Sequence, residues 1–92
     1  MELKDTVGMM QSEDYKERFK AEYHQTKIRY EKLKKFNTEN EATERTKFLC
    51  GYSSFKEPKH DCPPDMLREQ QHIMGEYLHL LEVRAEIEHI DL

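Results

Sequence analysis

Two stretches of this sequence repeat large apolar side chains at the three- and four-residue spacing of one α-helix face. In the first, DYKERFKAEYHQTKIRYEKLKKF over 14–36, the repeated face consists of Phe19, Tyr23, Thr26, Tyr30 and Leu33. Spacings of four, three, four and three residues indicate a heptad seam on a helix. Ser12 can cap its start, and the next seam positions, Asn37 and Asn40, are polar. We therefore predict a helix over 13–36.

The second stretch follows Pro63 and Pro64, which end a loop and suit the start of a helix. Its apolar positions are Met66, Leu67, Ile73, Met74, Tyr77, Leu78, Leu80, Leu81, Ala85 and Ile87. At helical periodicity they cover an arc of about 180°, whereas packing against one neighbour needs only about 100°. We predict a helix over 65–90 that has more apolar surface than one partner helix can cover.

That surplus predicts that copies of the chain assemble into a homo-oligomer, because soluble monomers rarely leave so wide an apolar face uncovered. Candidate contact residues are Met74, Leu78 and Ile87 on the second helix and Ile28 on the back of the first. Since Ile28 has no role in a simple pair of helices, we expect it to contact either the N-terminal segment or a second subunit.

The remaining segments complete the predicted architecture. Apolar residues near the N-terminus predict a short helix over 3–10. Between the long helices, 37–64 form a long connection, in which the capping-box sequence TENE allows a short helix over 39–49. The sequence thus predicts an all-α fold in a single domain: an antiparallel helical hairpin with a short N-terminal helix and a long inter-helix loop.

Composition excludes several classes of protein. The chain has 92 residues, 37% of them charged, and a net charge of −4, which argues against a general binder of nucleic acid polymers. No apolar run approaches the roughly 18 residues that a membrane span needs, and the N-terminus lacks the basic start of a signal peptide. Two cysteines make no disulfide framework. We expect a cytoplasmic protein without membrane contact.

Charge is divided between the two long helices. Residues 15–36 hold eight Lys/Arg against three Glu, or +5, and residues 65–92 hold two Arg against seven Asp/Glu, or −5. The simplest interpretation is that the two segments lie side by side. Arg84 falls within the apolar arc, and a buried arginine must be paired, so we predict a structural ion pair between Glu22 and Arg84.

Motifs for catalysis and metal binding are weak. The spacing Glu-x-x-His occurs at 69–72, 76–79 and 86–89, but these positions lie beside or behind the apolar arc and indicate a solvated polar face. Three soft ligands fall in one loop: Cys50, His60 and Cys62. Structural zinc needs four ligands, so ordinary loop thiols are favoured over zinc or a disulfide. With neither a glycine-rich phosphate loop nor a nucleophile signature, we predict no enzymatic activity, no metal and no cofactor.

A candidate ligand site lies on the first helix. Four lysines flank two tyrosines along one edge of its seam: Lys16, Lys20, Tyr23, Lys27, Tyr30 and Lys34. Aromatic rings can stack on a base while ammonium groups hold phosphate. The alternative is that the lysine stems cover core rings and their ammonium groups meet acids on the partner helix.

The stretches SEDYKERFKAEYHQTKIRYEKL and MGEYLHLLEVRAEIEHIDL, with Cys62-Pro63 before the latter, resemble a family of very small helical-hairpin proteins. These proteins occur in phages and prophages of gut-dwelling Firmicutes and in crAss-like phages. The resemblance covers 3–36 and 62–92; the chain departs from it by extra residues over about 38–60. It implies a hairpin made in the cytoplasm of an infected host. In shape, the hairpin is similar to phage sponge proteins that sequester cyclic nucleotides.

Two functions follow as leading hypotheses. The first is a non-enzymatic, anti-defence phage protein that binds and sequesters a small phosphorylated ligand, such as a nucleotide immune signal. The second is an interaction module that inhibits or bridges a host or phage protein through the aromatic residues of the connection: Phe48, Tyr52 and Phe55. A third, less favoured hypothesis is a packing protein without a specific ligand.

Overall fold

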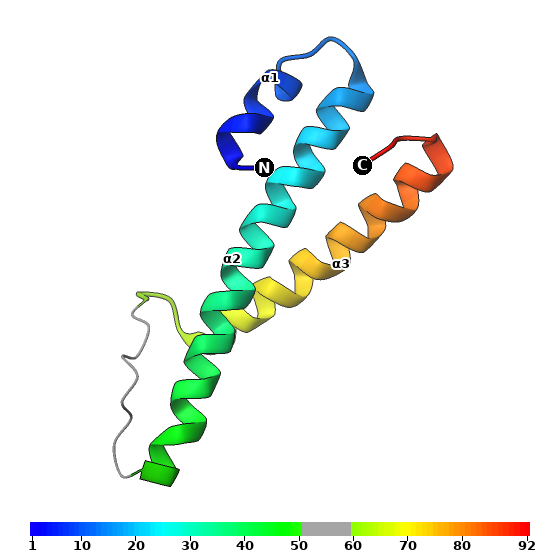
Figure 1. Ribbon diagram of the computed structural model, residues 1–92. Coiled ribbons are helices and arrows are strands. Elements are labelled where there is room, and N and C mark those ends of the chain that lie inside the picture. The colour runs from blue at the N-terminus through cyan, green and yellow to red at the C-terminus, as the bar shows by residue number, and fades with distance from the viewer. Residues whose placement is uncertain (51–59) are drawn as a thin grey trace.

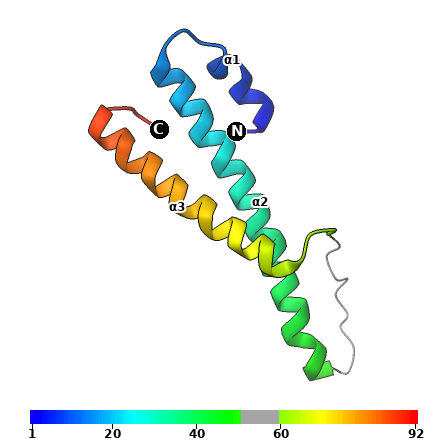
Figure 2. The same ribbon diagram turned by 180° about the vertical axis from the view of Figure 1, so that it is seen from behind.

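Two long antiparallel helices form the body of the computed structural model, which describes residues 1–50 and 60–92 and the side chains of all of these except 48–50 (Figure 1). They are α2, Tyr15–Cys50, and α3, Pro64–Glu88. A short 3-10 helix, η1 at Leu3–Thr6, runs into α1 at Val7–Met10. The view from behind shows α1 and α3 on different sides of α2 (Figure 2). The predicted all-α fold with two packed long helices is confirmed.

The start of α2 is held by side chains that accept backbone hydrogen bonds. Asp14 Oδ1 accepts from the Lys16 amide at 3.0 Å, and Ser12 Oγ accepts from the Asp14 amide at 3.1 Å. Such contacts satisfy amides that have no partner within the helix. The predicted cap, Ser12, therefore lies just outside the helix and supports Asp14, which caps it.

The predicted end of this helix at Phe36 is wrong, because α2 continues to Cys50. The predicted short helix over 39–49 is part of α2, so the predicted connection over 37–64 begins too early; α2 ends at Cys50 and α3 begins at Pro64. Local contacts support the extension: Arg45 Nη2 lies 2.9 Å from Glu41 Oε1. The hydroxyls of three threonines also donate to carbonyls one turn earlier: Thr38, Thr43 and Thr46.

The end of α3 folds the chain back towards α2. His89 adopts a left-handed conformation with φ of 56°, and the Ile90 amide donates to the Ala85 carbonyl at 2.8 Å. This arrangement is a common helix C-cap. It returns Ile90 to the core, where it is only 7% exposed. The observed helix lies within two residues of the predicted range 65–90.

The core joins one half of α2 to α3 and the C-terminal turn. Its buried members are Phe19, Tyr23, Leu78, Leu81, Ala85 and Ile90, and Tyr30 packs against them. Burying each large side chain of this kind stabilises the fold by about 1.5–3 kcal/mol. The predicted seam is thus confirmed at its three aromatic positions.

The N-terminal segment packs against α2 on the side away from α3. Thr6 is fully buried, and its Oγ1 accepts a hydrogen bond from Gln25 Nε2 at 2.8 Å. Ala21, one turn before Gln25 on the same face, is also fully buried. A small residue at this position lets the segment approach α2 closely. Neither this segment nor any other helix within 1–50 and 60–92 has the length and apolar character needed to cross a membrane.

Candidate functional site

A groove of about 1090 Å³ lies between α2 and α3. Both helices contribute to its wall, which includes Tyr30, Asn37, Arg68, Gly75, His79 and Arg84. Small-molecule sites in proteins have volumes of roughly 300–1,000 Å³. The groove is therefore large enough for a nucleotide-sized ligand.

The Tyr30 ring on α2 lies next to Gly75 on α3 at this groove. A Cβ atom added at Gly75 would lie 3.4 Å from Tyr30 Cε2 and 3.5 Å from its hydroxyl oxygen. The missing side chain thus leaves room for the aromatic ring to lie against the α3 backbone. Tyr30 remains half-buried and lines the groove, so part of its ring is available to a ligand.

Asn37 fixes the position of α3 at one end of the groove. It is 8% exposed, and its Nδ2 donates to the Leu67 carbonyl at 3.1 Å and to Gln71 Oε1 at 2.8 Å. A buried amide of this kind must be hydrogen-bonded to avoid a desolvation cost. Asn37 and Gln71 also give the groove neutral donors and acceptors.

Two arginines supply permanent positive charge to the groove wall. Within the described residues, Arg68 makes no hydrogen bond or ion pair with another side chain, so its guanidinium can receive an anion. Arg84 Nε donates to Glu88 Oε2 at 2.8 Å, and this bond raises the pKa of Arg84. Its guanidinium carbon lies 4.8 Å from the centre of the Phe19 ring.

The predicted ion pair between Glu22 and Arg84 is replaced by two other contacts, because each residue has a different partner. Arg84 pairs with Glu88 and is exposed, not buried as the sequence predicted. Glu22 accepts a hydrogen bond from the Tyr77 hydroxyl, and this bond raises the pKa of Tyr77. The charge of Glu22 still acts on Arg84 and contributes to its raised pKa.

The structure does not bring the six predicted ligand residues into one groove. Tyr30 lines the groove, but Tyr23 belongs to the core, and its hydroxyl donates to Glu82 Oε2 at 3.3 Å. Burial and the neighbouring Glu82 carboxylate raise the pKa of Tyr23. Lys27 Nζ lies 5.8 Å from the centre of the Tyr23 ring, as expected for a lysine that covers a core aromatic.

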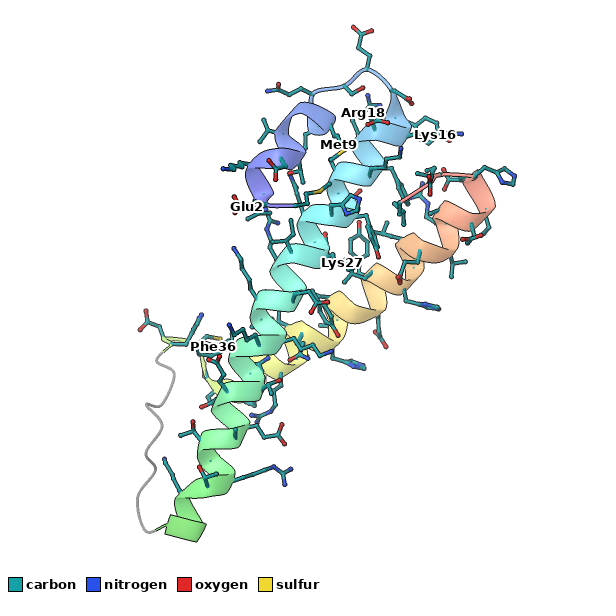
Figure 3. The ribbon with its side chains drawn as sticks, viewed as in Figure 1. Glu2, Met9, Lys16, Arg18, Lys27 and Phe36 are labelled. Atoms are coloured by element: carbon teal, nitrogen blue, oxygen red, sulfur yellow. The ribbon has the colours of Figure 1, made fainter. Side chains whose placement is uncertain are left out.

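The other three predicted lysines are spread along α2. Lys20 pairs with Glu17 at 3.4 Å, Lys16 is half-buried, and Lys34 is exposed. Lys16 and Lys27 alone lie about three helical turns apart (Figure 3). A role for these lysines in ligand binding stays a prediction.

Sequence reasoning missed most of the groove. The Glu-x-x-His spacing predicts a solvated face for His72 and His79; both are exposed, and both also line the groove. His72 Nε2 lies 3.3 Å from Glu76 Oε1, one turn further along α3. A signal for Asn37 existed, because it continues the heptad seam after Leu33. The polar side chain of Asn37 predicts the end of the helix, but Asn37 is instead the polar end of the contact between α2 and α3.

The predicted oligomer contacts have different environments. Leu78 is only 7% exposed, because it belongs to the core of its own chain, and this corrects its assignment to an intersubunit contact. Met74 and Ile28 are half-buried. Ile87 is 71% exposed and remains free for such a contact.

The segment with the three predicted soft ligands, Cys50, His60 and Cys62, is described only in part. His60 Nδ1 accepts a hydrogen bond from the Cys62 amide at 3.0 Å, and the His60 ring lies edge-on to Phe36 at 5.6 Å. The side chains of Phe48 and Cys50 are not described, and Tyr52 and Phe55 lie outside the described residues. In the part of the chain that is described, no group of three or more His, Cys, Asp or Glu side chains is placed to hold a metal.

A comparison with protein families gives one match. The model of a family described as Sequestin matches residues 13–87, more than three quarters of the chain. The matched range includes both long helices, except for the last residue of α3, and every groove residue named above. No curated protein and no solved structure gives a significant match.

Proposed function

The chain belongs to the Sequestin family, and on this premise we propose that it is a non-enzymatic phage accessory protein that sequesters a small phosphorylated ligand. The family description fits a sequestering role and a binding protein rather than a catalyst. The proposed ligand class is a nucleotide immune signal, and the proposed setting is the cytoplasm of an infected host. The protein would act there as a homo-oligomer, by lowering the concentration of free signal.

The observation that supports this function best is the composition of the groove between α2 and α3. Arg68 and Arg84 present guanidinium groups, which match phosphate oxygens in shape and charge. Tyr30 presents an aromatic ring on which a base can stack. Asn37 and Gln71 can exchange hydrogen bonds with base or ribose. Together, these three kinds of contact suit the phosphate, base and ribose of a nucleotide.

The four lysines that the sequence predicts as ligand residues have a lesser role in this proposal than the groove. Residues 15–36 carry a charge of +5, and their lysines raise the positive potential along α2. Such a potential would attract an anionic ligand towards the hairpin from a distance. Contact with the ligand is assigned to the groove, because Tyr23 is committed to the core.

Calorimetry against a panel of cyclic nucleotides and ADP-ribose derivatives tests the proposal, with thermal shift as a screen. A matched pair of variants locates the site: Arg68→Ala in the groove, and Arg29→Ala on the exposed surface of α2 outside it. Since a hydrogen bond to a charged group contributes about 1.5–3 kcal/mol, Arg68→Ala should weaken binding roughly ten-fold or more. Arg29→Ala should bind like the wild type.

Two results would contradict the proposal. One is the absence of a response to every member of the panel; if a specific host protein were captured instead, the interaction module predicted from the sequence would take its place. The other is equal weakening by Arg68→Ala and Arg29→Ala, because this would place the ligand outside the groove and make binding a general effect of charge.

A further inference from the structure

A stripe of apolar side chains runs along the exposed side of α3. Its members are seven residues apart over four repeats: Met66, Ile73, Leu80 and Ile87. They are 56%, 56%, 53% and 71% exposed, in that order. We call these four residues the α3 stripe. The buried residues of the same helix are Leu67, Leu78, Leu81 and Ala85, which lie on another face.

Four repeats at seven-residue spacing are typical of a helix that packs along its length against a second helix. Neither α2 nor the N-terminal segment covers the α3 stripe, since all four of its residues are exposed. Soluble monomers rarely expose a continuous apolar surface along a whole helix. The α3 stripe therefore requires a partner that presents a matching apolar stripe.

We propose that this partner is a second copy of the chain, and that its α3 packs antiparallel on the α3 stripe and completes the wall of the groove. The second part rests on the proposed function, because it assigns the groove as the ligand site. The homo-oligomer predicted from the sequence thereby gains a defined interface and a role in binding.

The α3 stripe is complementary to itself. Its midpoint lies between Glu76 and Tyr77, so an antiparallel pairing about this point sets Met66 level with Ile87 of the second copy. Ile73 likewise comes level with Leu80. The flanking charges follow the same symmetry, because Glu69 and Arg84 are equally far from the midpoint and come level with each other across the pair.

The groove and the α3 stripe are continuous. Leu80 belongs to both, and Val83, 45% exposed, lies beside the stripe and lines the groove. A helix packed on Leu80 would therefore stand at the groove's open edge. Each site would be incomplete in a single subunit, so ligand binding and dimer formation would strengthen each other.

The oligomeric state tests the interface without any ligand. Sedimentation equilibrium should give a dimer for the wild type and a monomer for Ile73→Glu and Leu80→Glu, with helix content by circular dichroism unchanged because both positions are exposed. Val7→Glu alters an apolar residue on α1 that is 48% exposed, and it should leave the dimer intact. A monomeric wild type, or stripe variants that remain dimeric, would overturn the inference.

Disulfide cross-linking tests the antiparallel direction in a Cys50→Ser, Cys62→Ser background. Glu76→Cys lies beside the symmetry axis and should cross-link readily to its copy, whereas Met66→Cys should not, because the two copies of residue 66 lie at opposite ends. Efficient cross-linking through Met66→Cys would show a parallel pair and contradict the proposed geometry.

Thiol reactivity tests closure of the groove in the same background. A probe introduced as Val83→Cys should react with a maleimide several-fold more slowly in the dimer than after addition of Leu80→Glu. A control probe, Ala42→Cys on the exposed surface of α2, should react equally in both. Rapid reaction of the Val83→Cys probe in the dimer would overturn closure alone. Slow reaction without binding of any panel nucleotide would instead overturn the proposed function.

Discussion

At the scale of single residues, two small features determine the geometry of the groove. Asn37 continues the heptad seam with an amide and bonds the first turn of α3. Gly75 lets the Tyr30 ring approach α3. The sequence shows both residues plainly, but their meaning depends on which part of the other helix lies opposite. The spacing along one helix does not contain that information.

Substitutions at Gly75 should separate helix stability from groove shape. An alanine side chain at this position fits at the limit of ordinary contact with Tyr30. Gly75→Ala should therefore stabilise the helix by up to about 1 kcal/mol. A gain of this kind raises the melting temperature by roughly 4–8 °C per kcal/mol. Gly75→Leu should displace Tyr30 and weaken ligand binding. Thermal melts and calorimetry check the pair, and a lower melting temperature for Gly75→Ala would contradict this account of the contact.

His24 should make the fold sensitive to acid. Its pKa is lowered from 6.5 by burial first, and then by the charges of Lys27, Lys20 and the N-terminal amine. Because the unfolded chain binds this proton more readily, the contribution of neutral His24 is fully present above pH 6.5 and is lost as pH falls through the lower folded value. The melting temperature should therefore drop between about pH 7 and 5.

His24→Gln should reduce that drop, because it removes the group that gains a proton on unfolding. His79→Gln, at an exposed histidine, is the matched control and should keep the wild-type pH dependence. Parallel melts of the three proteins across this pH range make the comparison. An equal drop in the wild type and in His24→Gln would exclude His24 as the cause.

At the scale of elements, the sequence predicted the helical segments that pack against each other. It did not predict the part of α2 that extends beyond this packing. The aromatic seam of α2 and the start of α3 follow from apolar spacing and prolines. The left-handed turn at His89, which ends α3 just before the predicted residue 90, was not predicted. The last part of α2 has little apolar signal, yet it stays helical through Glu41–Arg45 and threonine contacts. The end of a seam marks the end of a helix–helix contact, and it is not evidence that the helix itself has ended.

This distinction predicts uneven stability along α2. The helix continues past the start of α3 (Figure 1). Residues 40–46 lie outside the core cluster, and the side-chain hydrogen bonds described for them stay within α2; such local bonds are marginal in an isolated helix. The amides of 40–46 should exchange hydrogen much faster than those of 19–30, which pack in the core. Hydrogen exchange followed by mass spectrometry resolves the two ranges, and equal protection would contradict the role assigned to the core.

At the scale of the whole molecule, the hairpin is long and thin, with dimensions of 56 × 25 × 20 Å. Its radius of gyration is 17.2 Å, against about 12 Å for a compact domain of this length. The sequence predicted the hairpin and an uncovered apolar face on the second helix. It did not predict the groove, because the groove is formed by long-range pairing of α2 with α3. It also misassigned Leu78, which the chain covers itself.

We propose above all that the protein holds a phosphorylated ligand and returns it unchanged. The most direct measurement mixes the protein with each panel nucleotide, removes the protein by ultrafiltration, and quantifies the nucleotide in the filtrate before and after heat denaturation. One nucleotide should be depleted in proportion to the protein and should reappear intact after denaturation. Recovery of an altered product, or no depletion of any nucleotide, would contradict it.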